Sequence, residues 1–149
     1  MAKNNFFIPG GIRFTAEGGL AVLLTNKTGA NSIKGYLVRA HGSVEKAVEL
    51  IVKGDPDPFG VFYDSGIPDG SEAWVVFSGL ADVYFTAVGS TMGYFARNLL
   101  SGDTGDAGQI LSEAVPTSPF STDKHFLEIG HILETRVGAG LARVIMHFN

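Results

Sequence analysis

The clearest pattern in the chain is an alternation of side chains between residues 72 and 86. An alternation with a period of two residues over this length predicts one long β-strand with one buried face. A glycine on that face predicts a bend or bulge at a barrel corner. The parity expected to be buried has no polar member and consists of Ala73, Val75, Phe77, Gly79, Ala81, Val83 and Phe85.

The opposite parity of this strand is also rich in large apolar side chains, namely Trp74, Val76, Leu80 and Tyr84. A row of apolar side chains on a surface marks an interface more often than plain solvent contact. The pattern therefore predicts that part of this face meets another subunit, and we expect a homotrimer.

Several shorter segments have the β-branched and aromatic content of strands and are separated by glycine-rich turns. They are residues 12–15, 20–25, 35–40, 47–53, 59–63, 93–100, 125–135 and 141–148, the last two forming a hairpin around residues 138–140. Residues 43–52 allow a short helix as an alternative, and residues 110–115 fit either a helical turn or a strand. With 20 glycines among 149 residues, the chain is predicted to be all-β, with one small barrel or sandwich domain.

The pattern of apolar and polar residues does not decide whether the N-terminal region belongs to the domain. We divide the chain into an extended segment, residues 1–34, and a barrel or sandwich domain, residues 35–149. The first segment contains five large apolar residues on either side of Pro9-Gly10-Gly11: Phe6, Phe7, Ile8, Ile12 and Phe14. Residues 2 to about 25 either form an arm that packs on a neighbouring protein or contribute the first strands of the domain.

Composition and charge narrow the function classes. A chain of 15.8 kDa is the size of one domain. It has no cysteine, which excludes disulfides and cysteine-based metal sites. The net charge is −4, whereas a nucleic-acid-binding domain is usually basic, so we expect no nucleic-acid partner. The short apolar run before Pro9 is too short for a secretory signal, and we expect no membrane segment.

Residue types that carry chemistry occur without the spacing of known sites. Ser65 lacks the glycines of a nucleophile elbow, and the acidic residues of the loops do not match an EF-hand. These acidic residues are Asp55, Asp57, Asp64, Asp69, Asp103 and Asp106. We therefore predict no catalytic residues, no cofactor and no metal, and hence no enzyme.

The histidines are His41, His125, His131 and His147. On one continuous strand, His125 and His131 share a face but lie about 20 Å apart. They could not hold one metal ion through that segment alone, and structural hydrogen bonding is the expected role. Glu128 and Glu134 share a parity and are expected on a solvated face, rather than as a catalytic pair across a cleft.

Four segments carry a family resemblance: FGVFYDSGIPDGS (59–71), AWVVFSGLADV (73–83), EIGHILET (128–135) and LARVIMHFN (141–149). Together they resemble a family of small tailed-phage capsid proteins, the decoration or cement proteins on the outside of the head. The resemblance covers roughly residues 47–149 and involves structural motifs without catalytic residues.

The resemblance implies a β-rich, usually trimeric virion protein that is made in the host cytoplasm. Such a protein binds the outer surface of the capsid, with the major capsid protein as its partner, and stabilises contacts between major capsid subunits by added contact area. The alternative is a head-fibre or surface-exposed module that recognises a host glycan, with Trp74, Tyr84 and Tyr94 as candidate stacking residues.

Overall fold

The computed structural model describes residues 10–114 and 122–147, and this part of the chain is almost entirely β-structure, so the all-β prediction is confirmed. A single four-residue helix, α1, precedes the last two strands. The elements are β1 (Ile12–Phe14), β2 (Gly19–Asn26), β3 (Leu37–Ala40), β4 (Ala47–Leu50), β5 (Gly60–Phe62), β6 (Glu72–Phe85), β7 (Phe95–Asn98), β8 (Ile110–Glu113), α1 (Thr122–His125), β9 (Glu128–Ile132) and β10 (Gly140–Met146).

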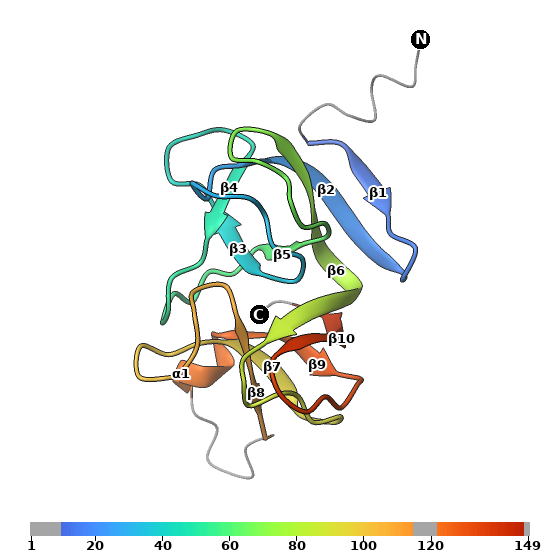
Figure 1. The fold of residues 1–149 in the computed structure, drawn as a ribbon, viewed down its shortest axis with the longest axis vertical. Coiled ribbons are helices and arrows are strands. Elements are labelled where there is room, and N and C mark those ends of the chain that lie inside the picture. Colours follow the sequence, from blue (N-terminus) through green and yellow to red (C-terminus); the bar gives the residue numbers. More distant parts are fainter. Residues whose placement is uncertain (1–9, 115–121, 148–149) are drawn as a thin grey trace.

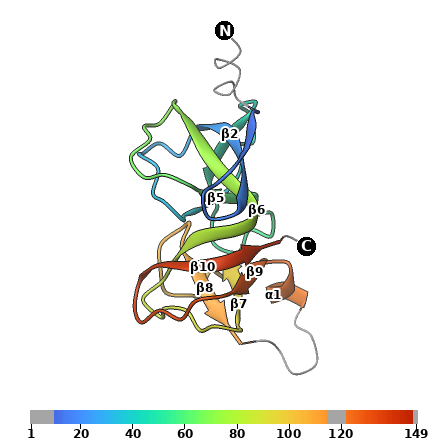
Figure 2. The same ribbon diagram turned by 90° about the vertical axis from the view of Figure 1, so that its right-hand side faces the viewer.

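The strands close into two five-stranded rings that share β6 (Figures 1 and 2). In the first ring, β6 pairs with β5 and with β2, and β4 and β3 complete the circuit. In the second ring, β6 pairs with β10, and β9, β7 and β8 follow in that order. Ile110 of β8 pairs with Phe85 of β6, and this pairing closes the second ring. One long strand therefore organises both halves of the molecule.

The bend predicted in the long strand is present at Gly79, where the first ring gives way to the second. This glycine has a φ of +78°, and a Cβ atom there would lie 2.7 Å from the carbonyl oxygen of Gly18. The register of β6 against β2 also shifts next to the bend, because Leu20 pairs with Ser78 and Ala21 with Val76. This shift explains why Val76, expected on the outer face, is buried.

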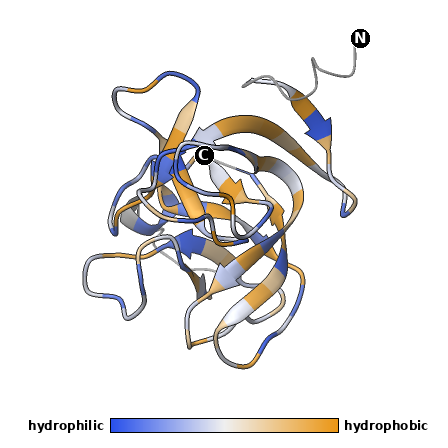
Figure 3. Cartoon of the chain, turned by 45° about the horizontal axis from the view of Figure 1, so that its top comes forward, coloured by the Kyte–Doolittle hydropathy of each residue, from blue (hydrophilic) through white to orange (hydrophobic). Residues whose placement is uncertain are grey.

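The buried side chains form two clusters, and Figure 3 shows most of the hydrophobic colour on the strands. The smaller cluster belongs to strands of the first ring and contains Val22, Val38, Val48, Phe62, Ala73 and Val75. The larger one combines residues of both rings, among them Leu37, Val61, Val76, Val83, Phe85, Ile110, Ile129 and Val144. Because this cluster joins the two rings, the described chain has a continuous core.

The second face of the long strand is packed largely within the chain. Val76 is buried, and Trp74 packs against the larger cluster. The guanidinium of Arg13 lies 4.5 Å from the centre of the Trp74 ring. The expectation that these side chains meet another subunit is therefore wrong for Val76, which is buried in the larger cluster, whereas Trp74 is partly buried and partly covered by Arg13 of β1.

The structure also decides the alternatives that the pattern left open. The segment 43–52 contains the strand β4 and no helix, and residues 110–113 form the strand β8. The predicted strand 125–135 is shorter, because α1 ends at His125 and β9 begins at Glu128. Strand β2 packs into the core, whereas all three residues of β1 are exposed; Phe6, Phe7 and Ile8 lie outside the described residues. No helix within residues 10–114 and 122–147 is long and apolar enough to cross a membrane.

The second ring contains a buried arginine that holds three chain segments together. Arg97 on β7 is only 2% exposed and contacts Asp103 at 2.7 Å and Glu113 at 2.8 Å. Lys124 from α1 also pairs with Glu113. Burial alone would raise the pKa of Asp103, but hydrogen bonds from Arg97 and from the Leu100 N–H outweigh it and lower that pKa. Hydrogen bonds from Lys124 and Arg97 likewise outweigh burial and lower the pKa of Glu113.

Replacing this arginine should destabilise the fold. Arg97→Met removes the charge that neutralises two partly buried carboxylates, and breaking such a buried pair costs about 3–5 kcal/mol of unfolding free energy. Urea denaturation at pH 7 measures the loss. Arg143→Met is the matched control, because Arg143 pairs at 2.7 Å with the single carboxylate of Asp82 and is 35% exposed. We expect the control to lose less than about 1 kcal/mol; equal losses would contradict the importance of the buried network.

The same network predicts a pH dependence. The pKa values of Asp103 and Glu113 are lower in the folded than in the unfolded chain, so their ionised forms stabilise the fold above about pH 4. This stabilisation should be lost as the pH falls through the folded values. Unfolding free energies measured from pH 6 down to pH 2 should therefore decrease steeply for the wild type and less steeply for Arg97→Met. Parallel curves would count against this assignment.

Candidate functional site

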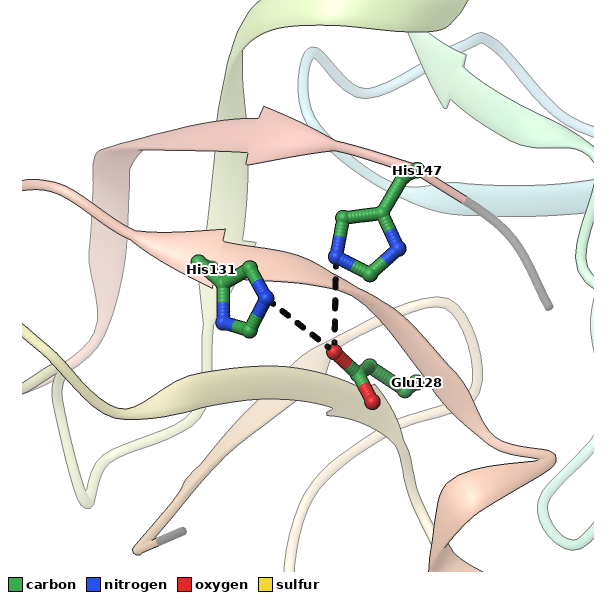
Figure 4. Close-up of side chains that lie close together, drawn as sticks. All are labelled: Glu128, His131 and His147. Atoms are coloured by element: carbon green, nitrogen blue, oxygen red, sulfur yellow. Dashed lines mark ion pairs between the residues drawn. The ribbon is translucent and has the colours of Figure 1, made fainter.

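Three side chains that can ligate a metal converge on the outside of the second ring (Figure 4). Glu128 and His131 belong to β9, and His147 follows directly after β10. The Nε2 atom of His131 lies 3.6 Å from Glu128 Oε1, and that of His147 lies 3.5 Å from the same oxygen. In residues 10–114 and 122–147, this is the only group of three or more such residues whose ligand atoms come together.

A β-bulge places Glu128 and His131 on one face. In a regular strand, two residues three positions apart point to opposite faces. The pairing of β7 with β9 is irregular, however, because Ala96 pairs with Gly130 and Arg97 with Glu128, which leaves Ile129 without an opposite residue. Ile129 and Ile132 both point into the core, and His131 between them is exposed. The extra residue reverses the alternation and brings the carboxylate and the imidazole together.

The bulge requires a glycine. Gly130 has a φ of +154°, and a Cβ atom there would lie 2.1 Å from the carbonyl oxygen of Ile145 on β10. No side chain fits at that distance from a backbone atom. The close approach of the two strands at Gly130 therefore depends on the missing side chain.

The hairpin of β9 and β10 positions the third member of the cluster. Ile145 pairs with His131, and the backbone N–H of His147 donates a hydrogen bond to Ile129 O at 2.9 Å. His147 is thus a diagonal neighbour of His131 across the two strands. Their ring centres are 4.8 Å apart.

His125 approaches the same carboxylate from the other side. It ends helix α1, and its Nδ1 atom lies 3.6 Å from Glu128 Oε2. The expected separation of about 20 Å between His125 and His131 along one strand is therefore wrong, because the chain turns between α1 and β9. The expectation of a solvated Glu128 is also wrong, since its side chain is only 10% exposed.

The sequence contains one signal for this cluster, the glycine at position 130. Gly130 interrupts a strand pattern, and an isolated glycine in a strand often marks a bulge. A bulge at this point would have moved His131 to the face of Glu128. The proximity of His147, by contrast, depends on the register of the hairpin, which the sequence did not specify.

The other candidate residues remain apart from this cluster. His41 Nδ1 accepts hydrogen bonds from the Ser43 and Val44 N–H groups, and its Nε2 lies 3.7 Å from Glu49. The loop carboxylates have separate roles: Asp55 pairs with Arg39, Asp69 accepts a bond from the Gly29 N–H, and Asp103 belongs to the buried arginine network. The Gly29 hydrogen bond, followed by the nearby Lys27 charge, lowers the pKa of Asp69.

The aromatic residues considered for glycan stacking also have neighbours within the chain. Arg13 covers Trp74, and Tyr84 packs edge-on against Tyr36 with ring centres 5.2 Å apart. Tyr94 retains partial exposure. Two of these three side chains are therefore engaged by their own chain.

Exposed apolar side chains occur mainly in two other places. On β1, Ile12 and Phe14 are exposed, Phe14 by 80%, and this strand pairs along one edge with β2. At the far end of the second ring, the loops 86–94 and 133–139 lie side by side, since Ser90 and Arg136 exchange backbone hydrogen bonds. The exposed apolar residues of these loops are Val88, Met92, Leu133 and Val137.

Comparison with known proteins gives one informative similarity. The fold matches the crystal structure of the N base of head fiber gp8.5 in bacteriophage phi29, with a TM-score of 0.55 and 13% sequence identity. The match covers 85% of this chain and 92% of that chain. This chain therefore shares its fold with a module of a phage head fibre. No family model and no curated protein matches the sequence.

The glycine of the bulge offers a direct test of this local structure. Gly130→Ala forces a side chain against the Ile145 carbonyl, and we expect a loss of at least about 2 kcal/mol of unfolding free energy. Gly138→Ala is the matched control, because Gly138 also has a positive φ, +77°, but open space around it. The control should lose about 1 kcal/mol. Urea denaturation measures both, and equal losses would contradict the steric argument.

Proposed function

We propose that this chain is a structural protein of a tailed-phage head that binds the outer surface of the capsid and stabilises contacts between major capsid subunits. The observation that carries the proposal is the match of its fold to a phage head-fibre base over 85% of the chain. The resemblance of residues 47–149 to decoration proteins supports the same role. In this reading the protein acts through contact area rather than through catalysis.

The exposed strand β1 supports a role for the N-terminal segment in attachment. Its three residues are exposed, and β2 is its only strand partner among the described residues. Burying an apolar side chain of this kind in an interface contributes about 1.5–3 kcal/mol before the entropy cost of ordering the segment. We therefore assign the capsid contact to β1 and the residues that precede it.

A head-fibre base is the second candidate, and the matched head-fibre module specifically favours it. A fibre base also attaches to the head, but it carries a further protein or segment that reaches away from the capsid. Recognition of a host glycan belongs to this alternative. A glycan array with the purified chain separates the two roles: a decoration protein should bind no glycan, whereas a receptor-binding module should bind a defined set.

The attachment role predicts that a charge on β1 prevents binding to the capsid. Phe14→Asp places a carboxylate in the proposed apolar contact and should leave the fold intact, because Phe14 is largely exposed. We expect its affinity for phage heads that lack this protein to fall by at least about tenfold, measured by co-sedimentation.

Two further variants complete this experiment. Val52→Asp is the matched control, since Val52 is an exposed apolar residue on the loop between β4 and β5, and it should bind like the wild type. A chain lacking residues 2–14 should fold and lose binding. If that truncated chain folds and saturates the heads with unchanged affinity, the N-terminal segment is not the attachment site. If it fails to fold, the segment belongs to the domain.

We also propose a homotrimer, with the end loops of the second ring at its interface. Closed symmetry buries the same apolar patch of every subunit, and Val137 is 96% exposed in the single chain. Light scattering should give three times the chain mass of 15.8 kDa for the wild type and for Val52→Asp. Val137→Asp should dissociate into monomers; a monomeric wild type at micromolar concentration would refute the trimer.

A further inference from the structure

We propose that Glu128, His131 and His147 form a binding site for a divalent transition-metal ion, and that Zn²⁺ is the ion suited to this donor set. Each of the three residues offers one ligand atom, and these atoms lie within 4.8 Å of one another. Two imidazole nitrogens and one carboxylate oxygen form a donor set that proteins use for zinc. The site is independent of the capsid-binding role proposed above.

The distances fit a metal polyhedron better than a set of hydrogen bonds. A hydrogen bond between an imidazole and a carboxylate has a nitrogen–oxygen distance of about 2.7–3.2 Å. The two histidine nitrogens lie farther away, at 3.6 and 3.5 Å from the same oxygen. Ligands about 2.0–2.1 Å from a tetrahedral zinc ion are separated by about 3.3–3.4 Å. These two nitrogen–oxygen distances are therefore close to the spacing of ligands around zinc. The two histidine nitrogens lie within 4.8 Å of each other, and rotation of the imidazole rings would bring them to the same spacing.

The exposed fractions of the three side chains suit a metal site that solvent can reach and whose carboxylate has a fixed position. The Glu128 side chain is 10% exposed and so has a restricted position, whereas His131 and His147 are 52% and 42% exposed. The half-exposed rings can rotate toward an ion that enters from solvent. The backbone on both sides of the site is held by the hairpin, including the hydrogen bond from the His147 N–H to Ile129 O. Water can complete the coordination, since His125 faces the other oxygen of Glu128.

The donor set also predicts selectivity. Mg²⁺ and Ca²⁺ prefer oxygen ligands, whereas imidazole suits zinc and its neighbours among the transition metals. A bound ion would join β9 to the residue that follows β10 and would thereby fix the end of the last strand. Binding to the folded state alone stabilises that state. Zinc should therefore raise the melting temperature, and Mg²⁺ should not.

The test uses the full chain without a histidine tag and ZnCl₂ as the probe. Isothermal titration calorimetry at pH 7.5 should show one zinc ion bound per chain. With free zinc at about one hundred times the dissociation constant, the melting temperature should rise by about 5 °C or more. His131→Gln and His147→Gln should each weaken binding by about 100-fold or more, because each removes one ligand. MgCl₂ should give neither binding nor a shift.

His41→Gln is the matched control, because His41 also lies beside a glutamate, Glu49, but has no second histidine near it among the described residues. This variant should bind zinc like the wild type. Crystals soaked in ZnCl₂ and measured at the zinc absorption edge should show one anomalous peak between Glu128, His131 and His147. Lack of stoichiometric binding, unchanged binding in both ligand variants, or a peak only elsewhere would overturn the proposal.

Discussion

Strand β6 is the constraint on which the rest of the structure depends, because it belongs to both five-stranded rings. Its first half pairs with β5 and β2, and its second half pairs with β10 and, at its end, with β8. Closed rings satisfy the backbone hydrogen bonds of their strands and remove free edges. Among the described strands, β1 pairs along one edge only, and β8 meets β6 only at the pair Phe85–Ile110.

Glycine solves two different geometric problems in this arrangement. At Gly79 the positive φ allows β6 to bend from one ring into the next while Gly18 passes close by. At Gly130 the missing side chain allows β9 to bulge against β10. The bend at Gly79 connects the two rings. The bulge at Gly130 turns His131 to the outer face, beside Glu128, while Ile129 and Ile132 remain in the core. The same residue type thus supports the fold in one place and the cluster in the other.

The structural role proposed above rests on the shared fold and on the exposed apolar side chains. The fold is shared with a head-fibre base despite 13% identity, which indicates that the arrangement of strands, rather than particular side chains, is what the two proteins have in common. Among the described residues, two groups of exposed apolar side chains lie on β1 at the first ring and on the end loops of the second ring. The proposed attachment and the proposed self-association would therefore use separate surfaces, and repetition over many identical sites would add avidity to weak single contacts.

The sequence by itself determined the fold class and most of the strands, but it left residues 43–52 and 110–115 open between helix and strand. Alternation over residues 72–86 and glycine-rich turns elsewhere were sufficient, because local side-chain periodicity reflects which face of a strand is buried. It also indicated the bend at Gly79. Only the tertiary structure decided that β6 serves two rings and that Val76 is buried by its own chain, since pairing between distant strands has no local signature. The cluster of Glu128, His131 and His147 was likewise decided in three dimensions, because a one-residue bulge reverses the face of His131 and the register of β10 brings in His147.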